Sequence, residues 1–564
     1  MRAVFAACLV ISFANCTIQL RTQRTQLNAS GAGIFQINPL SYPPYSVSPH
    51  VHSRVSSLAI SSSPTSDSVC RESLNRRTRA LLVSSRATSS VECLLHSTTH
   101  SQITIDELSD KVLLGVFRYF LDASPRHWIR LVHICHKWRR IVFEAQRPLS
   151  LRLFCTHGTP VLKNLDCWPA LPIVVEYGGS PPLTAKDENN IVAALKRSER
   201  VHSITLTITS SLLKKLSTLE GPFSELEDLN LRSRHTMQLT SPSTFRWGSR
   251  LRCLHLSGIA FPTLLRLLSS SNNLVELRLH DVLQIIYFLP ETLAKFLAGM
   301  PQLRSFSLHF PSSPTYSALP PPSERFVLPA LTHLDFLGTI QYLENLTAII
   351  DAPRLEGIEI TPIDYPDTRY PKFCEFVNRI QIHKSHSQAH ILFSKGSISI
   401  SLTQPGSPAY LRLQSPINQI HEQLFYIAQI CVDFSSFLSN VRALLISSTQ
   451  PKWDGVVTES WGQVFNPFSG VTWLHLGATH LNIVMSALFF LELESKHVLP
   501  ALHKLYISQA RRHAPLTHTV VSFITSRRLS GHYIAVEFEQ SGEICGTGTW
   551  WQCQVPYQLP ANTF

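Results

Sequence analysis

LRCLHL (251–256), LVELRL (274–279) and LRSFSL (303–308) are three copies of one short pattern, L-x-x-L-x-L. Successive side chains of a strand point to opposite faces, so the regularly spaced Leu residues are expected to share one buried face. Apart from one break between the copies at 355 and 441, neighbouring copies begin between 23 residues apart (251 to 274) and 31 residues apart (471 to 502). The other copies are VHSITL (201–206), LEDLNL (226–231), LTHLDF (331–336), LEGIEI (355–360), VRALLI (441–446), VTWLHL (471–476) and LHKLYI (502–507).

Helical patterns separate these strands, as in PTLLRLLSSS (262–271) and PETLAKFLAGM (290–300). A period of about 20 to 30 residues with this motif resembles the leucine-rich repeat. The resemblance implies an α/β solenoid over residues 148–510, in which stacked neighbours bury faces that no single unit can bury. The solenoid is expected to be irregular, because the Asn that usually follows the strand is replaced, for example by Ser257-Gly258.

The residues that alternate with the Leu positions are expected to form the opposite, concave face of the solenoid. This band is polar, rich in His, and contains two aromatic residues. Every strand has an outward side, so a merely solvated face remains an alternative to a binding surface. Arg, Trp and Tyr are common hot-spot residues in interfaces. The residues expected to bind a target protein are His255, Arg278, His280, His309, Trp473, His475 and Tyr506.

A second informative stretch is ITIDELSDKVLLGVFRYFLDASPRHWIRLVHICHKWRRIVFEA (103–145), which is dense in apolar residues at helical spacing. Asp110 is expected to cap a first helix. Ser124 is expected to cap a second, with Pro125 in its first turn, where a missing N–H is harmless. The apolar pattern continues through Trp138 into a third, short helix.

Residues 101–147 resemble an F-box. The family's opening of Leu, Pro and an acidic residue is matched by Leu108-Ser109-Asp110, with Ser109 in place of the Pro. The later family positions are matched by Leu113-Leu114, Val116-Phe117, Trp128, Leu131, Ile134-Cys135 and Trp138-Arg139. The alternative is that these residues are only the core of a three-helix unit. A unit this small buries little apolar surface alone, which favours a partner.

This resemblance implies the substrate-recognition subunit of an SCF-type, cullin-based ubiquitin ligase. The F-box would bind a Skp-type adaptor, and through it a cullin, while the repeats hold an unknown target protein. Such a subunit is not an enzyme, needs no cofactor or metal, and contributes proximity. The layout is similar to that of F-box proteins of mushroom-forming fungi. The expected adaptor contacts are Leu108, Leu113, Val116, Phe117, Trp128, Leu131, Cys135 and Trp138.

The charge distribution argues against a nucleic-acid-binding protein. The chain has 50 Lys and Arg and 38 Asp and Glu, a net charge of +12. Residues 1–100 hold nine Arg and three acidic residues, so 9 − 3 = +6 of that charge lies there rather than on a binding domain. This Ser- and Arg-rich stretch is expected to be a disordered leader. No apolar run in the sequence reaches the roughly 18 residues needed to cross a bilayer, so no membrane span is expected.

Few patterns suggest catalysis. The sequence contains no G-x-G-x-x-G, Walker A, H-E-x-x-H or G-x-S-x-G pattern. His386 and His390 would share the face of a helix and suit a metal, but exposed loop or strand histidines are the simpler interpretation. Glu492 and Glu494 at i, i+2 point apart on a helix and are interpreted as ordinary helix-end charges. Residues 511–564 include the strand-like VEFE and are expected to cap the last repeat.

Two alternative functions remain open. The first is a leucine-rich-repeat binding module without ligase coupling, motivated by Ser109. The second is a secreted recognition protein, because MRAVFAACLVISFANC (1–16) is similar to a weak signal peptide. The twelve cysteines, none of them spaced C-x-x-C, favour a reducing compartment instead. The expected location is therefore the cytoplasm, the nucleus or both.

Overall fold

The computed structural model describes residues 108–539 apart from internal gaps, of which the longest are 239–245, 261–267, 282–288, 311–324, 450–457 and 509–517. The described residues fall within one compact unit, Ile103–Phe564. The predictions for the leader (1–100) and for the signal-like start (1–16) lie outside the described residues. Residues 540–564 of the expected cap also lie outside them.

The first described elements are three α-helices and a 3-10 turn. The first helix begins one residue earlier than predicted, so Asp110 is its first residue and Ser109 is the N-cap. Asp110 is therefore no cap, and its carboxylate accepts a hydrogen bond from Arg140 at 2.9 Å. The elements are α3 (Asp110–Ala123), η2 (Pro125–His127), α4 (Trp128–Val132) and α5 (His136–Glu144).

These helices pack around two tryptophans. The Trp138 ring lies 4.7 Å from that of Phe117, centroid to centroid, and so joins α5 to α3. Trp128 is fully buried, and its indole N–H donates to the Arg152 carbonyl oxygen at 2.8 Å. A buried Trp satisfies its single donor in this way. The bond connects the helices directly to the chain that enters the sheet.

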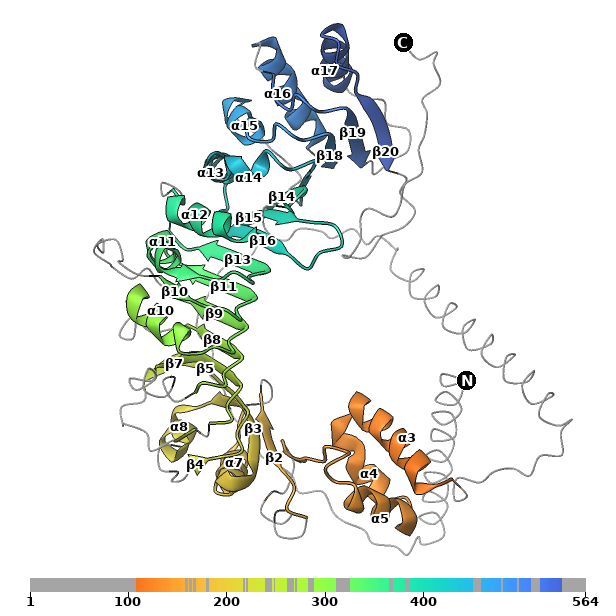
Figure 1. The fold of residues 1–564 in the computed structure, drawn as a ribbon, viewed down its shortest axis with the longest axis vertical. Coiled ribbons are helices and arrows are strands. Elements are labelled where there is room, and N and C mark those ends of the chain that lie inside the picture. The colour runs from red at the N-terminus through yellow and green to blue at the C-terminus, as the bar shows by residue number, and fades with distance from the viewer. Residues whose placement is uncertain are drawn as a thin grey trace, which may run out of the picture. The chain divides into compact units, whose positions relative to one another are not determined.

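A large, mostly parallel sheet follows, so the protein is a mixed α/β structure (Figure 1). Sixteen strands are hydrogen-bonded side by side in the described part of the chain. In spatial order they are β1 (Leu153–Cys155), β2 (Ile173–Tyr177), β3 (Val201–Ile208), β5 (Asp228–Gln238), β7 (Cys253–Ala260), β8 (Glu276–His280), β9 (Ser305–His309), β11 (His333–Gly338), β13 (Gly357–Pro362), β16 (Tyr410–Ser415), β15 (Ser397–Thr403), β14 (Gln388–Ser394), β17 (Ala443–Ser448), β18 (Trp473–Gly477), β19 (Lys504–Ser508) and β20 (Ala535–Glu539).

Two further pairs of very short strands lie outside this sheet. They are β4 (Pro222–Phe223) with β6 (Arg246–Trp247), and β10 (Phe326–Val327) with β12 (Ile350–Asp351).

The repeated motif aligns from strand to strand. Leu254 pairs with Leu277, which pairs with Phe306, and the same level continues through Leu334 to Ile358. All five side chains are at most 2% exposed. Burying one such side chain contributes about 1.5–3 kcal/mol, so each added strand extends one continuous core. The prediction that these motifs are strands with a shared buried face is confirmed.

Helices cover one face of the sheet, and the other face carries none of the labelled helices (Figure 1). The predicted helix at 290–300 is present as α10, whereas that at 262–271 falls largely in a gap. The helices of this layer are α7 (Ala185–Leu195), α8 (Ser210–Leu216), α10 (Pro290–Ala298), α11 (Ile340–Ile349), α12 (Pro371–Arg379), α13 (Ile420–Asp433), α14 (Ser435–Leu438), α15 (Thr458–Phe465), α16 (Leu481–Leu493) and α17 (His518–Leu529).

The strand order departs from the chain order at one place. β15 pairs antiparallel with β14 on one side and with β16 on the other. β16 in turn pairs with β13, and β14 pairs with β17. The sheet is therefore continuous across the segment that lacks the repeat motif. At the C-terminal end of the sheet, β20 pairs in parallel with β19, and α17 lies between these two strands in the chain. The sheet thus extends beyond residue 510, where the sequence placed the start of the cap.

Candidate functional site

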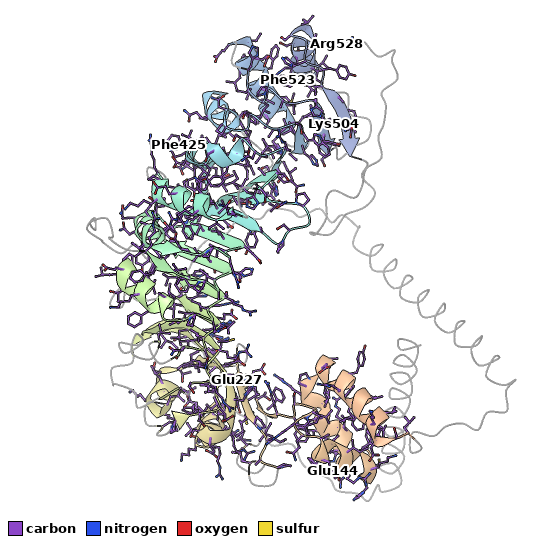
Figure 2. The ribbon with its side chains drawn as sticks, viewed as in Figure 1. Glu144, Glu227, Phe425, Lys504, Phe523 and Arg528 are labelled. Carbon is purple, nitrogen blue, oxygen red and sulfur yellow. The ribbon has the colours of Figure 1, made fainter. Side chains whose placement is uncertain are left out.

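The open face of the sheet carries one continuous row of side chains, here called the central row. Its members sit at paired positions on successive strands and alternate with buried residues of the core. Lys504, on a strand, and Phe425, on α13, mark the open side and the helix side of the sheet (Figure 2). The central row consists of Thr205, Asn230, His255, Arg278, Ser307, Asp335, Glu359, Arg412, Ser401, His390, Leu445, His475, Tyr506 and Glu537.

The seven residues predicted to bind a target all lie on this open face. Four of them belong to the central row, and His280, His309 and Trp473 lie on the rows beside it. Near one end, Lys504 Nζ lies 5.4 Å from the centre of the Trp473 ring, and the rings of Trp473 and Tyr506 are 5.9 Å apart. The structure therefore groups these residues into separate clusters rather than one site.

Glu276 contacts two of the predicted target-binding residues, His255 and Arg278. Its carboxylate pairs with Arg278 on the same strand and lies 3.1 Å from His255 Nε2 on the neighbouring strand. Burial lowers the pKa of His255, and the negative charge of Glu276 opposes that shift. The Arg278 side chain is 48% exposed, so its guanidinium remains available to a partner.

A denser cluster lies on the next three strands, β8, β9 and β11. We call His280, Ser307, His309 and Asp335 the His–Asp cluster. The rings of His280 and His309 stack with centroids 3.9 Å apart and planes 4° from parallel. Both rings direct Nε2 at the Ser307 hydroxyl, at 2.7 Å and 3.3 Å. Asp335 Oδ2 lies 2.7 Å from that hydroxyl and 2.8 Å from His309 Nε2.

The geometry of this cluster does not suit a serine nucleophile. In a Ser-His-Asp triad one imidazole nitrogen faces the serine and the other faces the carboxylate. Here His309 uses the same nitrogen, Nε2, toward both Ser307 and Asp335. One nitrogen cannot take the serine proton while it donates its own proton to the carboxylate. The four polar atoms converge on one point instead of forming a relay.

Burial sets the protonation of the cluster. Burial, with the neighbouring His309 as a second cause, lowers the pKa of His280 to about 4. Burial alone would raise the pKa of Asp335, but hydrogen bonds from His309 and Ser307 outweigh it and hold that pKa below its usual value. At neutral pH the cluster therefore contains a neutral His280 beside an ionised carboxylate.

The sequence analysis did not find this cluster, because its members come from three different repeats. A signal was nevertheless present. His280 and His309 each follow the last Leu of their motif, in LVELRLH and LRSFSLH. Equal positions in adjacent repeats become neighbours in a parallel sheet, so two such histidines must lie side by side. The sequence also predicted no metal site, whereas His280, His309 and Asp335 place three metal-ligating atoms within 4.8 Å of one another.

The predicted adaptor contacts divide into two groups in the structure. Five of the eight have side chains that are 0–2% exposed and form the core of the helical unit. These five are Leu113, Phe117, Trp128, Leu131 and Trp138. As adaptor contacts they remain a prediction. Leu108, Val116 and Cys135 are partly exposed, and the Cys135 sulfur caps α5 by accepting from the Trp138 N–H at 3.5 Å.

Other apolar side chains of the helices are exposed. On α3, Val112 and Tyr119 are 45% and 70% exposed and flank the partly exposed Val116. Positions i, i+4 and i+7 share one face of a helix, so the three residues form a single stripe, which we call the α3 stripe. Ile129 on α4 and Ile134 before α5 are exposed as well, at 38% and 47%. The repeated apolar pattern did not reveal which residues face outward.

The remaining candidates for chemistry have structural roles in the described residues. His390 lies half-buried on β14, and His386 precedes that strand and is only 2% exposed, so the two share no helix and the exposed placement of His386 was wrong. Glu492 is buried against Arg527 rather than solvated at a helix end. Burial raises the pKa of the Cys155 and Cys253 thiols to about 12, which keeps both protonated.

No protein-family model matches the chain, and no curated protein matches it. Within the described residues, no helix combines the length and apolar character needed to cross a lipid bilayer. Any functional conclusion therefore rests on the residues and their geometry.

Proposed function

We propose that this chain is the substrate-recognition subunit of an SCF-type ubiquitin ligase, acting without bond chemistry of its own in the cytoplasm or nucleus. In this proposal helices α3–α5 are an F-box that binds a Skp-type adaptor, and through it a cullin. The sheet and its helices are an irregular leucine-rich-repeat solenoid whose open face holds the target protein. The observation that carries the proposal is the α3 stripe, apolar surface that the helical unit does not bury.

The burial of the two tryptophans supports this reading of the helices. With Trp128 and Trp138 inside, the packing leaves apolar residues on the outer side of α3. Exposed apolar surface on a unit this small indicates a protein partner. The Trp128 bond to Arg152 joins that unit to the start of the sheet, so a partner on α3 would be coupled to the binding face by ordered structure.

The open face supports the role in target binding. It extends over all sixteen strands and presents aromatic, Arg and His side chains that are only partly engaged with one another. Interfaces favour Tyr, Trp and Arg at their centres. A receptor needs a wide surface of this kind, because it has to hold a target without changing it.

Co-purification with a Skp-type adaptor tests the first half of the proposal. The double variant Val112→Glu/Val116→Glu places two charges on the α3 stripe. A charge buried without a partner costs on the order of 3 kcal/mol, or about 100-fold in affinity. The matched control is Val521→Glu on α17, where the valine is 37% exposed and far along the chain from the helices. Equal adaptor binding by both variants would refute the F-box assignment.

Capture of targets tests the second half. Arg278→Glu reverses a charge on the central row beside Glu276 and should reduce recovery of proteins that accumulate when the proteasome is inhibited. Arg528→Glu is the control, because Arg528 is exposed on α17 on the helix side of the sheet (Figure 2). Adaptor binding should be unchanged in both. Identical target recovery would place recognition away from this row.

A second candidate is a binding module that does not couple to a ligase. Ser109 motivates it, because the F-box family has Pro at this position. The Ser109 backbone has φ −63°, the value that proline imposes, and its carbonyl oxygen accepts from the N–H groups of Val112 and Leu113. The start of α3 is thus compatible with the family pattern, which favours the ligase role.

A further inference from the structure

The His–Asp cluster has the composition of a metal site. Two imidazole nitrogens and one carboxylate oxygen, from His280, His309 and Asp335, lie within 4.8 Å of one another. Two His and one carboxylate are a common ligand set for Zn²⁺, and imidazole also suits the other first-row divalent ions. The ligands come from three adjacent strands, so the sheet itself holds them in place.

We propose that His280, His309 and Asp335 bind a divalent transition-metal ion, Zn²⁺ in the first instance, on the open face of the sheet.

The three ligand atoms are arranged around the Ser307 hydroxyl. Both imidazoles turn the same atom, Nε2, toward the Ser307 hydroxyl, although they come from separate strands. The two rings stack with planes 4° from parallel, so each has to turn about its side-chain bonds to bring its in-plane lone pair onto a shared ion. Asp335 turns Oδ2 to the same point. The three ligand atoms thus surround the Ser307 hydroxyl, and an ion would bind beside it. Their composition and their spacing within 4.8 Å of one another are what support the site.

Exposure leaves room for a further ligand. The side chains of His309 and Asp335 are 25% and 41% exposed, while Ser307 is 4% exposed beneath them. A zinc ion with three protein ligands keeps a fourth position for water or another donor. The partial exposure of His309 and Asp335 would leave such a position accessible to solvent. This inference stands on the cluster alone and does not depend on a ligase role.

The alternative for this cluster is a hydrogen-bonded network without an ion. In that network His280 donates to Ser307, and both Ser307 and His309 donate to Asp335. The two readings differ in the part of Ser307, which is the centre of the network but is not needed as a ligand. Ser307→Ala therefore separates them, because it removes the network and retains the three ligand atoms.

Titration of the metal-free full chain with Co²⁺, followed by visible absorption, measures the site directly. Co²⁺ reports His and carboxylate ligation through its d–d bands. Added Zn²⁺ should displace it, because such sites bind Zn²⁺ more tightly than Co²⁺. Mg²⁺ prefers oxygen ligands and should not displace it. Asp335→Asn should weaken Co²⁺ binding more than about 100-fold, since loss of even an outer-shell partner costs about 10- to 100-fold. His280→Ala/His309→Ala should abolish it.

Two controls make the outcome decisive. His255→Ala removes another histidine of the open face that pairs with a carboxylate but has no second histidine beside it, and it should leave the bands unchanged. Ser307→Ala should also retain them. The proposal is overturned if Asp335→Asn and the double His variant bind the same number of ions with the affinity of the unmodified chain. Loss of binding in Ser307→Ala with retention in Asp335→Asn would overturn it equally.

Discussion

The Arg527 guanidinium lies 3.0 Å from Glu492 Oε2, and the two side chains are 1% and 3% exposed. The contact joins α17 to α16 near the end of the sheet, and Arg527 also donates to the Val498 carbonyl oxygen. Burial lowers the pKa of Arg527, and the charge of Glu492 opposes that shift. A charged pair in an otherwise apolar layer is sensitive to loss of either member, since the remaining charge cannot be solvated.

Glu492→Ala should therefore destabilise the chain by about 3–5 kcal/mol, the range for an unpaired buried charge. Denaturant unfolding monitored by circular dichroism measures this loss. Glu494→Ala, two residues on and exposed, is the matched control and should change stability by less than about 0.5 kcal/mol. The double change Glu492→Leu/Arg527→Met should recover most of the loss. Similar curves for the two glutamate variants would contradict the prediction.

Trp128→Ala should unfold the helical unit rather than remove a contact with a partner. The side chain is 0% exposed, and truncation of a buried aromatic residue costs about 3–5 kcal/mol. We expect lower helix content and easy proteolysis near α3–α5. Tyr119→Ala, at a side chain that is 70% exposed, should leave both unchanged. A folded Trp128→Ala protein with normal protease resistance would show that this core is not cooperative.

The fold was predictable where the signal is local. Leu254 and Leu277 occupy equal positions of a motif, so their shared buried face and parallel pairing followed from spacing alone. The reversed order of β14, β15 and β16 depends on the pairing of β16 with β13 and of β14 with β17, which no local pattern encodes. The strand at VEFE was predicted, but its parallel pairing with β19 as part of the main sheet was not, because this last unit lacks the motif.

The candidate sites were less predictable for the same reason. Apolar spacing indicated that Trp128 and Val116 are important, but it did not distinguish the buried side of a helix from the exposed one. That distinction is decided by which helices pack together. The His–Asp cluster similarly requires three strands in register, so only a comparison between repeats would have paired His280 with His309.

Ser109→Pro should be tolerated and slightly stabilising. The backbone at Ser109 already has φ −63°, and the carbonyl oxygen that caps α3 is retained in proline. A proline at a compatible position stabilises by about 0.4–1 kcal/mol through the unfolded state. The midpoint temperature of thermal unfolding should rise by a small amount, and adaptor binding should change little. A clear loss of stability would show that the Ser109 N–H or the residue before it is constrained.

His386 predicts a specific loss of stability in acid. Burial lowers its pKa from the ordinary 6.5 to about 4, so the folded chain keeps this ring neutral where the unfolded chain protonates it. Between pH 6.5 and about 4 the unfolded state therefore binds more protons, and stability falls as the pH falls. The full difference in pKa corresponds to on the order of 3 kcal/mol for this 2% exposed side chain.

His386→Leu removes the titration, so the unfolding free energy of this variant should decline less steeply than that of the unmodified chain from pH 7 to pH 4.5. His421→Leu, on a side chain that is not buried, controls for the loss of a histidine elsewhere. Parallel pH profiles for all three proteins would show that His386 does not stay neutral in the folded state.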